Sequence, residues 1–443
     1  MAESRREAWH TLVHVCRRWR TLVFGSPQRL GLKIFCTDRR RVGERLHVWP
    51  ALPIVISGFC GSTECLDNIK AALEYNDRIC RISISILAFC HLKNIFAALE
   101  RPLPALTELW LSALPLVDDL DPPLVFPDLF KFLGRPVHLQ SFILKGISVH
   151  RLPDILLSFT NLVILGISSI PDSGYISPEA MITVLIALTK LEKLALTFKS
   201  PRYFTHQERQ LPPQTRIIIP TLTHFWFKGA SNYLEDLIYQ IDAPLLNLLE
   251  VVFFHQHTLA TPHLHQLIRC MSQTMQIPDK AHLEFTDQTV HIEFSSSIFR
   301  GDSDALKLGI VYVELERQFP HVAQFCHPPF MPFPTPECLY IGYAPHWQKM
   351  RQLDIKNAQW QEFFQSFVTV KNIYLSKQIA PCIVSALQEL AGETTTEVLP
   401  TLQNIFLEEF QPSGPVHEAI QHFVAARWPS GRDIVISHWD RTE

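Results

Sequence analysis

Two closely spaced histidine pairs come nearest, in residue type and spacing, to a metal site. They are His255-Gln-His257 and His263-Leu-His265. On a strand, alternate histidines share one face, so a pair could supply two of the ligands that zinc needs. No cysteine or carboxylate cluster nearby would complete such a site. We therefore interpret these histidines as polar loop and edge residues, and we expect neither a metal ion nor another cofactor.

Residues for covalent catalysis are equally sparse. A nucleophilic cysteine or serine must lie beside a base, and Cys326-His327 is only an adjacency in sequence. The sequence contains no phosphate-binding Gly-Lys-Ser/Thr loop, no G-x-S-x-G turn and no H-E-x-x-H motif. We expect that the protein is not an enzyme.

The ten cysteines form no CxxC pair, and the closest approaches are Cys60/Cys65 and Cys80/Cys90. Scattered cysteines of this kind are typical of buried free thiols in a reducing compartment. The N-terminus lacks the apolar run of a signal peptide, and no charge-free apolar stretch reaches the length of about eighteen residues that a membrane span needs. The sequence therefore predicts no membrane span and a location in the cytoplasm, the nucleus or both.

The charge of the chain is distributed unevenly. Residues 1–45 contain eleven Lys/Arg and four Asp/Glu, a net charge of +7, and the remaining residues carry −10. A basic segment could bind nucleic acid, and that binding would weaken steeply with salt. The commoner explanation is the solvated side of short helices, so we regard a nucleic-acid partner as the less favoured hypothesis.

A short apolar pattern, LxxLxL, recurs along the chain. One copy reads Leu106-Thr-Glu-Leu109-Trp-Leu111 and another reads Leu191-Glu-Lys-Leu194-Ala-Leu196. Copies start at positions 79, 106, 139, 162, 191, 222, 248, 370 and 402. Apart from the gap between 248 and 370, the spacings of 23 to 33 residues lie within or slightly above the leucine-rich-repeat period of roughly 20–29 residues. The pattern predicts strands whose apolar side chains point inward and whose variable side chains point outward along one sheet.

Helical patterns lie between these strands. Apolar spacings of three and four predict helices over 67–73, 176–188 and 416–424. In the second, Ser177 is the expected N-cap with Pro178 at the first helical position. Alternation of strand and helix predicts an α/β fold, a leucine-rich-repeat solenoid with a curved parallel sheet and helices on its outer face. We expect inserted loops at 201–221 and 327–336.

The repeat is irregular between about 255 and 369. Strand-like runs remain there, and we interpret them as degenerate repeats of the same parallel array. They are 281–285, 290–294, 306–313 and 337–343.

Residues 9–24 place apolar side chains on one helical face, and Val15-Cys-Arg-Arg-Trp19-Arg is followed by Ser26-Pro27. This segment resembles the last helix of an F-box, in which the Val, Cys and Trp pack inward. With the repeats behind it, the chain resembles the F-box/leucine-rich-repeat family of basidiomycete fungi over nearly its whole length. Further segments that carry the resemblance are 48–54, 174–180, 225–229, 233–237, 241–244 and 398–407.

The resemblance implies an F-box remnant over 1–31, its C-terminal half only, and a leucine-rich-repeat solenoid over 32–443. It implies a substrate receptor of an SCF-type cullin-RING ubiquitin ligase, with Val15, Cys16 and Trp19 contacting the SCF adaptor protein. The front half of a full F-box, with its Leu-Pro-rich helix, has no counterpart in this sequence. A scaffold or decoy that binds a protein but no ligase adaptor therefore stays open as the alternative.

The variable strand positions nominate a binding surface for an unknown protein substrate. Large aromatic residues recur among them, and interfaces favour such anchors among polar residues. The competing explanation is that aromatic residues simply suit strands. The residues that we expect on the concave sheet are Trp110, Lys145, Lys193, Trp226, Lys228, Phe254, Tyr374 and Phe406.

Overall fold

The structure is a computed structural model of the chain. It describes residues 15–25, 32–38, 41–43, 46, 52–87, 89–99, 101–113, 125–126, 138–200, 216–254, 261–296, 305–312, 314–327, 330–333, 336–344, 355–390, 398–408, 414–427 and 433–440. The chain divides into two compact units, residues 1–199 and 200–443, and each is described by itself. The predicted boundary at residue 31 remains a prediction.

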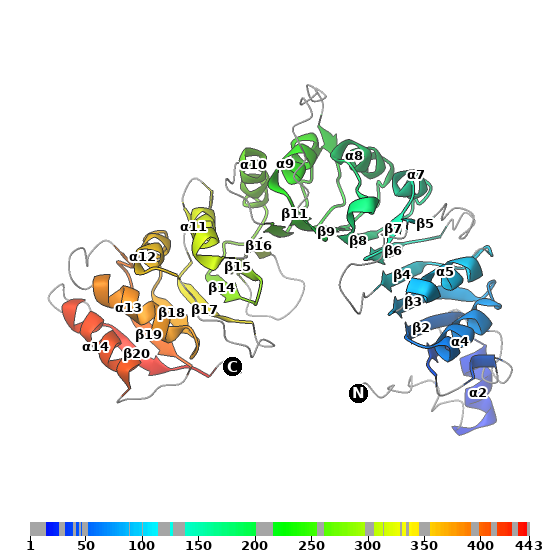
Figure 1. Cartoon of the computed structure of the whole chain (residues 1–443), viewed down its shortest axis with the longest axis horizontal. Helices are drawn as coiled ribbons and strands as arrows, with labels where there is room; N and C mark the ends of the chain where they lie inside the picture. Colours follow the sequence, from blue (N-terminus) through cyan, green and yellow to red (C-terminus); the bar gives the residue numbers. More distant parts are fainter. Residues whose placement is uncertain are drawn as a thin grey trace. The chain divides into compact units, whose positions relative to one another are not determined.

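Unit 1 is a parallel sheet with helices along one side (Figure 1). The strands follow the order β1-β2-β3-β4-β6-β8-β9. Their bounds are β1 (Leu32–Cys36), β2 (Ile54–Cys60), β3 (Ile79–Ile86), β4 (Glu108–Ala113), β6 (Ser141–Lys145), β8 (Ile164–Ile170) and β9 (Lys193–Phe198), with β5 (Val125–Phe126) and β7 (Ser148–Val149) in a separate pair. The helices are α2 (Arg17–Phe24), α4 (Thr63–Leu73), α5 (Phe89–Ala98), α7 (Leu152–Leu156), the 3-10 turn η2 (Asp172–Gly174) and α8 (Pro178–Ala187).

The repeated leucines explain this sheet. Leu109, Phe142, Leu165 and Leu194 are directly opposite one another on successive strands and are all buried. Each buried aliphatic side chain contributes about 1.5–3 kcal/mol of transfer free energy. The parallel pairing of these strands confirms the predicted α/β leucine-rich-repeat fold.

The helix starts follow the expected capping chemistry. Ser177 Oγ accepts a hydrogen bond from the Ala180 N–H at 3.2 Å, and Pro178 opens α8, which confirms the predicted cap. Ser62 caps α4 in the same way through the Cys65 N–H. The predicted helices over 67–73 and 416–424 are also confirmed.

Unit 2 has the strand order β11-β13-β16-β15-β14-β17-β18-β19-β20. The bounds are β11 (His224–Gly229), β13 (Leu248–Phe253), β14 (Lys280–Phe285), β15 (Thr289–Ser295), β16 (Ala305–Val311), β17 (Cys338–Tyr343), β18 (Asn372–Leu375), β19 (Asn404–Leu407) and β20 (Val435–His438), with β10 (Ile217–Ile218) paired to β12 (Ile241–Asp242) separately. The helices are α9 (Ser231–Gln240), α10 (Pro262–Met271), α11 (Leu315–Cys326), α12 (Asn357–Gln365), α13 (Ala380–Leu390) and α14 (Pro415–Arg427). Figure 1 shows these helices along one side of the sheet.

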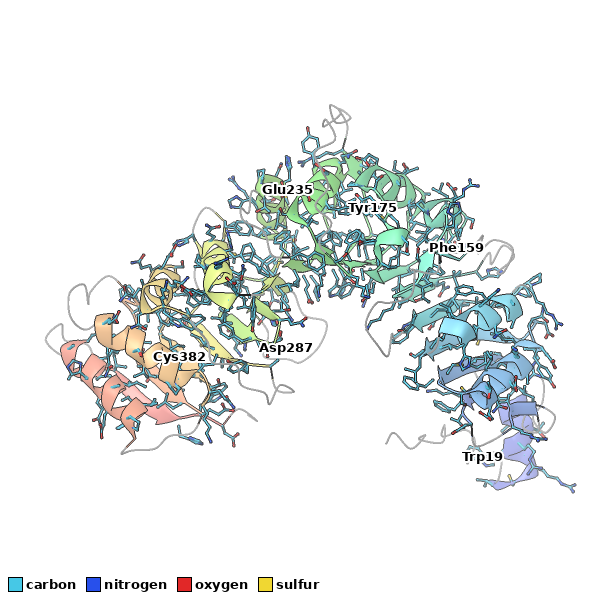
Figure 2. All side chains as sticks on the ribbon, in the orientation of Figure 1. Trp19, Phe159, Tyr175, Glu235, Asp287 and Cys382 are labelled. Atoms are coloured by element: carbon cyan, nitrogen blue, oxygen red, sulfur yellow. The ribbon has the colours of Figure 1, made fainter. Side chains whose placement is uncertain are left out.

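The middle of unit 2 corrects one prediction. All four strand-like runs between 255 and 369 are strands, but β15 is antiparallel to both β14 and β16. The three strands form a meander inserted in reverse order, so that β16 pairs with β13 and β14 pairs with β17. The segment is therefore not a run of degenerate parallel repeats. A short turn around Asp287 makes the reversal, where the Thr286 N–H donates to the Thr289 carbonyl (Figure 2).

None of the helices in the described part of the chain combines the length and apolar character needed to cross a membrane.

Candidate functional site

One row of side chains runs across the sheet of unit 2 on the face that points away from the helices, called here the open face. Each residue of the row is directly opposite the next on the neighbouring strand. Within the row, three charged residues follow one another and four aromatic rings follow one another beside them. The row consists of Trp226, Glu250, Lys307, Glu293, His282, Tyr340, Tyr374, Phe406 and Ser437.

Four rings of this row form a continuous stack, the aromatic ladder of His282, Tyr340, Tyr374 and Phe406. The ring centroids of His282 and Tyr340 are 4.4 Å apart with an interplanar angle of 5°. The next two separations are 4.2 Å at 10° and 4.5 Å at 8°. All four side chains remain partly exposed. Parallel register forces this stacking, because side chains that share a row stand about one strand spacing, roughly 4.8 Å, apart.

The C-terminal segment contacts this ladder. Trp439 follows β20, and its backbone N–H donates to the Leu407 carbonyl at 2.8 Å. The Trp439 ring meets Tyr374 at 5.4 Å and 71° and Tyr340 at 5.9 Å and 61°. Both are edge-to-face contacts, each of which contributes about 0.5–1.5 kcal/mol beyond simple burial.

The other half of the row is charged. Lys307 Nζ lies 4.0 Å from Glu250 Oε1, and Glu293 is directly opposite Lys307 on β15. In the next row, His291 Nε2 lies 3.0 Å from Glu284 Oε2. The Lys307–Glu250 pair is partly exposed, and such pairs add little stability but orient a charged partner. His291 is buried, so its contact with Glu284 is part of the sheet's packing.

The tyrosine hydroxyls of the ladder stay protonated. Burial, followed by the neighbouring Tyr374, raises the pKa of Tyr340 above its ordinary value, and burial also raises the pKa of Tyr374. Neutral hydroxyls can donate and accept hydrogen bonds, but they supply no base near neutral pH. The ladder is thus suited to holding an apolar or aromatic group with hydrogen bonds at its rim.

Of the predicted contact residues in unit 2, Trp226, Lys228, Tyr374 and Phe406 are partly exposed on the open face. Phe254 is a correction, because its side chain is buried rather than exposed. It follows the end of β13, and the Lys228 ammonium lies 5.8 Å from its ring centroid. Burial lowers the pKa of Lys228. Lys228 therefore packs against Phe254, and the two are not independent surface positions.

Unit 1 carries its own exposed aromatic residues on the face of its sheet that points away from its helices. Trp110 is 49% exposed and shares a row with Phe35, while Phe59 lies one row further along the strands. The Lys33 ammonium lies 5.1 Å from the ring centroid of Phe35. Of the predicted residues, Lys145 is exposed and Lys193 is partly exposed.

The predicted adaptor-binding residues lie on or directly before α2. Val15, Cys16 and Trp19 are all exposed, so the expected inward packing is wrong for the described residues. Figure 2 labels Trp19 on α2. Val15, Trp19 and Leu22 follow one another at spacings of four and three and are 62%, 45% and 62% exposed. This spacing places them on one helical face, which forms an apolar stripe.

The histidine pairs do not come together. His255 and His257 lie outside the described residues, whereas His263 and His265 lie on α10 rather than on a strand. Residues two apart on a helix point in different directions. His263 packs against Tyr239 and His265 against Phe330. Among the described residues, no group of three or more His, Cys, Asp or Glu side chains is placed to hold a metal ion.

Of the nine cysteines whose side chains are described, four are buried. Cys326 is buried in α11, and burial raises its pKa far above the ordinary value, which disfavours the nucleophilic thiolate. Cys60 is buried with its Sγ 3.5 Å from His91 Nδ1. Cys16 and Cys270 are exposed, in contrast to the prediction of buried thiols.

Several residues of the open face were not among the predicted contacts, namely His282, Tyr340, Glu293, Lys307 and Trp439. The alternation within the runs 281–285 and 337–343 already places His282 and Tyr340 on the outward face. The reversed direction of β15, which brings Glu293 into the row, has no comparable signal in the sequence.

No protein-family model matches the chain, and no curated protein matches it. Among solved structures, the chain is similar to the leucine-rich repeat-containing protein LegL7 from Legionella pneumophila, with a TM-score of 0.31, 10% identity and coverage of 89% of this chain and 97% of that one. It is also similar to a chain of the yeast Rad7–Elc1 complex, with a TM-score of 0.29, 14% identity and coverage of 84% and 76%. The fold assignment rests on the strand registers and burial described above.

Proposed function

We propose that the chain is a protein-binding module whose partner docks on the open face of unit 2, with the aromatic ladder as its anchor. The observation that carries this proposal is the stack of partly exposed rings from Tyr340 to Phe406. Exposed aromatic residues ringed by polar groups dominate the binding energy of protein interfaces.

The charged half of the row supports the same function. Glu250, Lys307 and Glu293 continue the line of the ladder across neighbouring strands. A partner that covered the ladder would extend over these charges, which would fix its orientation and disfavour wrong partners. The competing explanation, that aromatic residues simply suit strands, accounts for the ring types but does not by itself explain their continued exposure.

At a finer level, we propose that the module is the substrate receptor of an SCF-type cullin-RING ubiquitin ligase. The support is the F-box-like segment Val15-Cys-Arg-Arg-Trp19 together with the exposed apolar stripe on α2. A stripe of this kind suits insertion into an apolar groove of another protein. The alternative is a scaffold that binds a protein through the open face but recruits no ligase.

A photo-cross-linking experiment tests partner binding. A benzoylphenylalanine at position 406 should capture specific proteins in an extract of the source cells, and Tyr340→Ala should abolish that capture. The matched control places the same group at Ile186, which is 53% exposed on α8, a helix of unit 1. Capture of the same proteins from both positions would argue against a specific interface.

Co-purification with the ligase adaptor separates receptor from scaffold. If the receptor role is correct, the chain binds the adaptor and Trp19→Ala removes that binding, whereas Arg18→Ala, one position away on α2, retains it. Absence of adaptor binding by the folded wild-type chain would leave the scaffold function.

A further inference from the structure

The last strand of the sheet, β20, buries less of its side chains than the two strands before it. β18 and β19 alternate between partly exposed and buried residues, whereas in β20 both terminal residues are exposed and the two central ones are only partly buried. Val435, the first residue of β20, is 54% exposed. Segments with few buried apolar contacts open locally at low free-energy cost.

Two side chains anchor this strand at its ends. Ile434, directly before β20, is buried, and Trp439, directly after it, packs edge-to-face on Tyr340 and Tyr374. Backbone hydrogen bonds from the Val435 and Trp439 N–H groups to Gln403 and Leu407 connect the strand to β19. The segment therefore attaches as an added peptide strand does, through main-chain bonds plus an aromatic anchor.

From this arrangement we infer that β20 is a resident ligand, and that the partner supplies an extended segment which replaces it. The incoming segment pairs in parallel with β19 and places an aromatic side chain on the ladder where Trp439 lies. The inference rests on the proposed function, and it adds the chemical class of the partner's contact segment.

The resident strand also specifies the sequence pattern of that segment. An apolar residue takes the buried position of Ile434, and an aromatic residue follows five positions later, as Trp439 does. Because alternate residues of a strand face opposite sides, this odd spacing directs the first side chain to the helix side and the second to the open face. Among the residues between them, Ile436 is partly buried opposite the buried Ile405, whereas Val435 and His438 are exposed.

A peptide of residues 433–440, Asp-Ile-Val-Ile-Ser-His-Trp-Asp, tests the inference as a fluorescent probe of the full chain. We expect the Trp439→Ala chain to bind it about ten-fold more tightly than the wild-type chain, because the resident strand competes less well after losing its aromatic contacts. The matched control is His438→Ala, an exposed position on the same strand, which should bind as weakly as wild type. A probe with Ala in place of Trp should bind about ten-fold less tightly to the Trp439→Ala chain.

Hydrogen exchange on the wild-type chain gives a second readout that needs no variant. Amides of residues 435–439 should exchange faster than those of β18 and β19 if the last strand opens locally. Equally slow exchange, or equal peptide binding by the folded Trp439→Ala and wild-type chains, would overturn the inference. In that case cross-links from position 406 would still support the proposed function. A stable dimer of the wild-type chain in light scattering would instead indicate that a second copy of the chain supplies the strand that replaces β20. That result would overturn the assignment to a different partner.

Discussion

Gly309 and His291 are directly opposite each other on the antiparallel strands β16 and β15. A Cβ atom added to Gly309 would lie 2.8 Å from the Cβ of His291 and 3.1 Å from the Val290 carbonyl oxygen. The reversed meander thus brings two backbones together at a position where only glycine fits.

Gly309→Ala should therefore lower the free energy of unfolding by about 1–3 kcal/mol, because the close contact forces the strands apart. Denaturant unfolding followed by circular dichroism measures the change. Gly43→Ala is the matched control, since no atom lies within 4 Å of the added Cβ there. Equal stability of the two variants would contradict the reversed topology of β14–β16.

The Glu235 carboxylate caps the next helix. Glu235 is buried on α9, where Figure 2 labels it. It accepts hydrogen bonds from the N–H groups of His263 and Leu264 at 2.8 and 2.9 Å. Glu235→Ala should cost about 1–3 kcal/mol of stability, because two donors at the start of α10 lose their partner. Glu235→Gln keeps an acceptor at the same place and should cost less.

The pH dependence of the Gln variant tests the charge state of Glu235. Desolvation by burial is the largest effect on its pKa and raises it. A folded-state pKa above the unfolded value means that the wild type loses stability as pH rises through the folded pKa. The stability of Glu235→Gln relative to wild type should therefore increase from pH 4 to pH 7. A constant difference in denaturant unfolding across this range would show that the carboxylate titrates normally.

Arg427 is the last residue of α14. Its buried guanidinium donates to the carbonyls of Leu399 and Val398, and it lies 4.6 Å from the Phe423 ring centroid. Leu399 has a left-handed backbone with φ of 50°. Arg427→Ala should reduce the free energy of unfolding by about 3 kcal/mol, because buried carbonyls lose charged donors. Arg427→Lys, which restores one donor group, should recover part of this loss; a wild-type melting temperature for the Ala variant would refute the role.

Alkaline pH should weaken unit 2 through the ladder. The pKa values of Tyr340 and Tyr374 are raised in the folded chain. Their contribution to the free energy of unfolding is therefore complete below the unfolded pKa of about 10, and it is lost as pH rises through the folded pKa values. The double variant Tyr340→Phe/Tyr374→Phe should lose less stability than wild type between pH 9 and pH 11. Identical pH profiles for the double variant and the wild type would contradict burial of the two hydroxyls.

The fold was largely predictable because the repeated pattern encodes both burial and strand direction. Where LxxLxL copies follow at regular intervals, as at Leu162 and Leu222, the strand is followed by a helix and the next long strand pairs with it in parallel. Alternation alone, as in 290–294, predicts a strand but not its direction, since a period of two is the same read forwards or backwards. The antiparallel placement of β15 depends on contacts between distant segments.

The candidate site was predictable only in part. Trp226, Tyr374 and Phe406 follow from their place in the repeat, and Tyr340 could have been found from the alternation of its run. Phe254 was predicted on the open face by parity, but it follows the end of β13 and is buried, with the Lys228 ammonium 5.8 Å from its ring centroid. The contact of Trp439 with rings two and three strands away could not be read from spacing at all.

The reversed meander also imposes an order on assembly. An ordinary repeat array can grow by adding each unit to the one just made, so its contacts stay local in sequence. Within unit 2, the free edge of β13 is paired by β16, which comes two strands later in the sequence than β14. The neighbours of β14 are β15 and β17, and both follow it in the sequence. Growth along the array is therefore interrupted at this point, and three strands must be placed together before it resumes. Formation of the β14–β16 meander should therefore be the step that sets the folding rate of the unit.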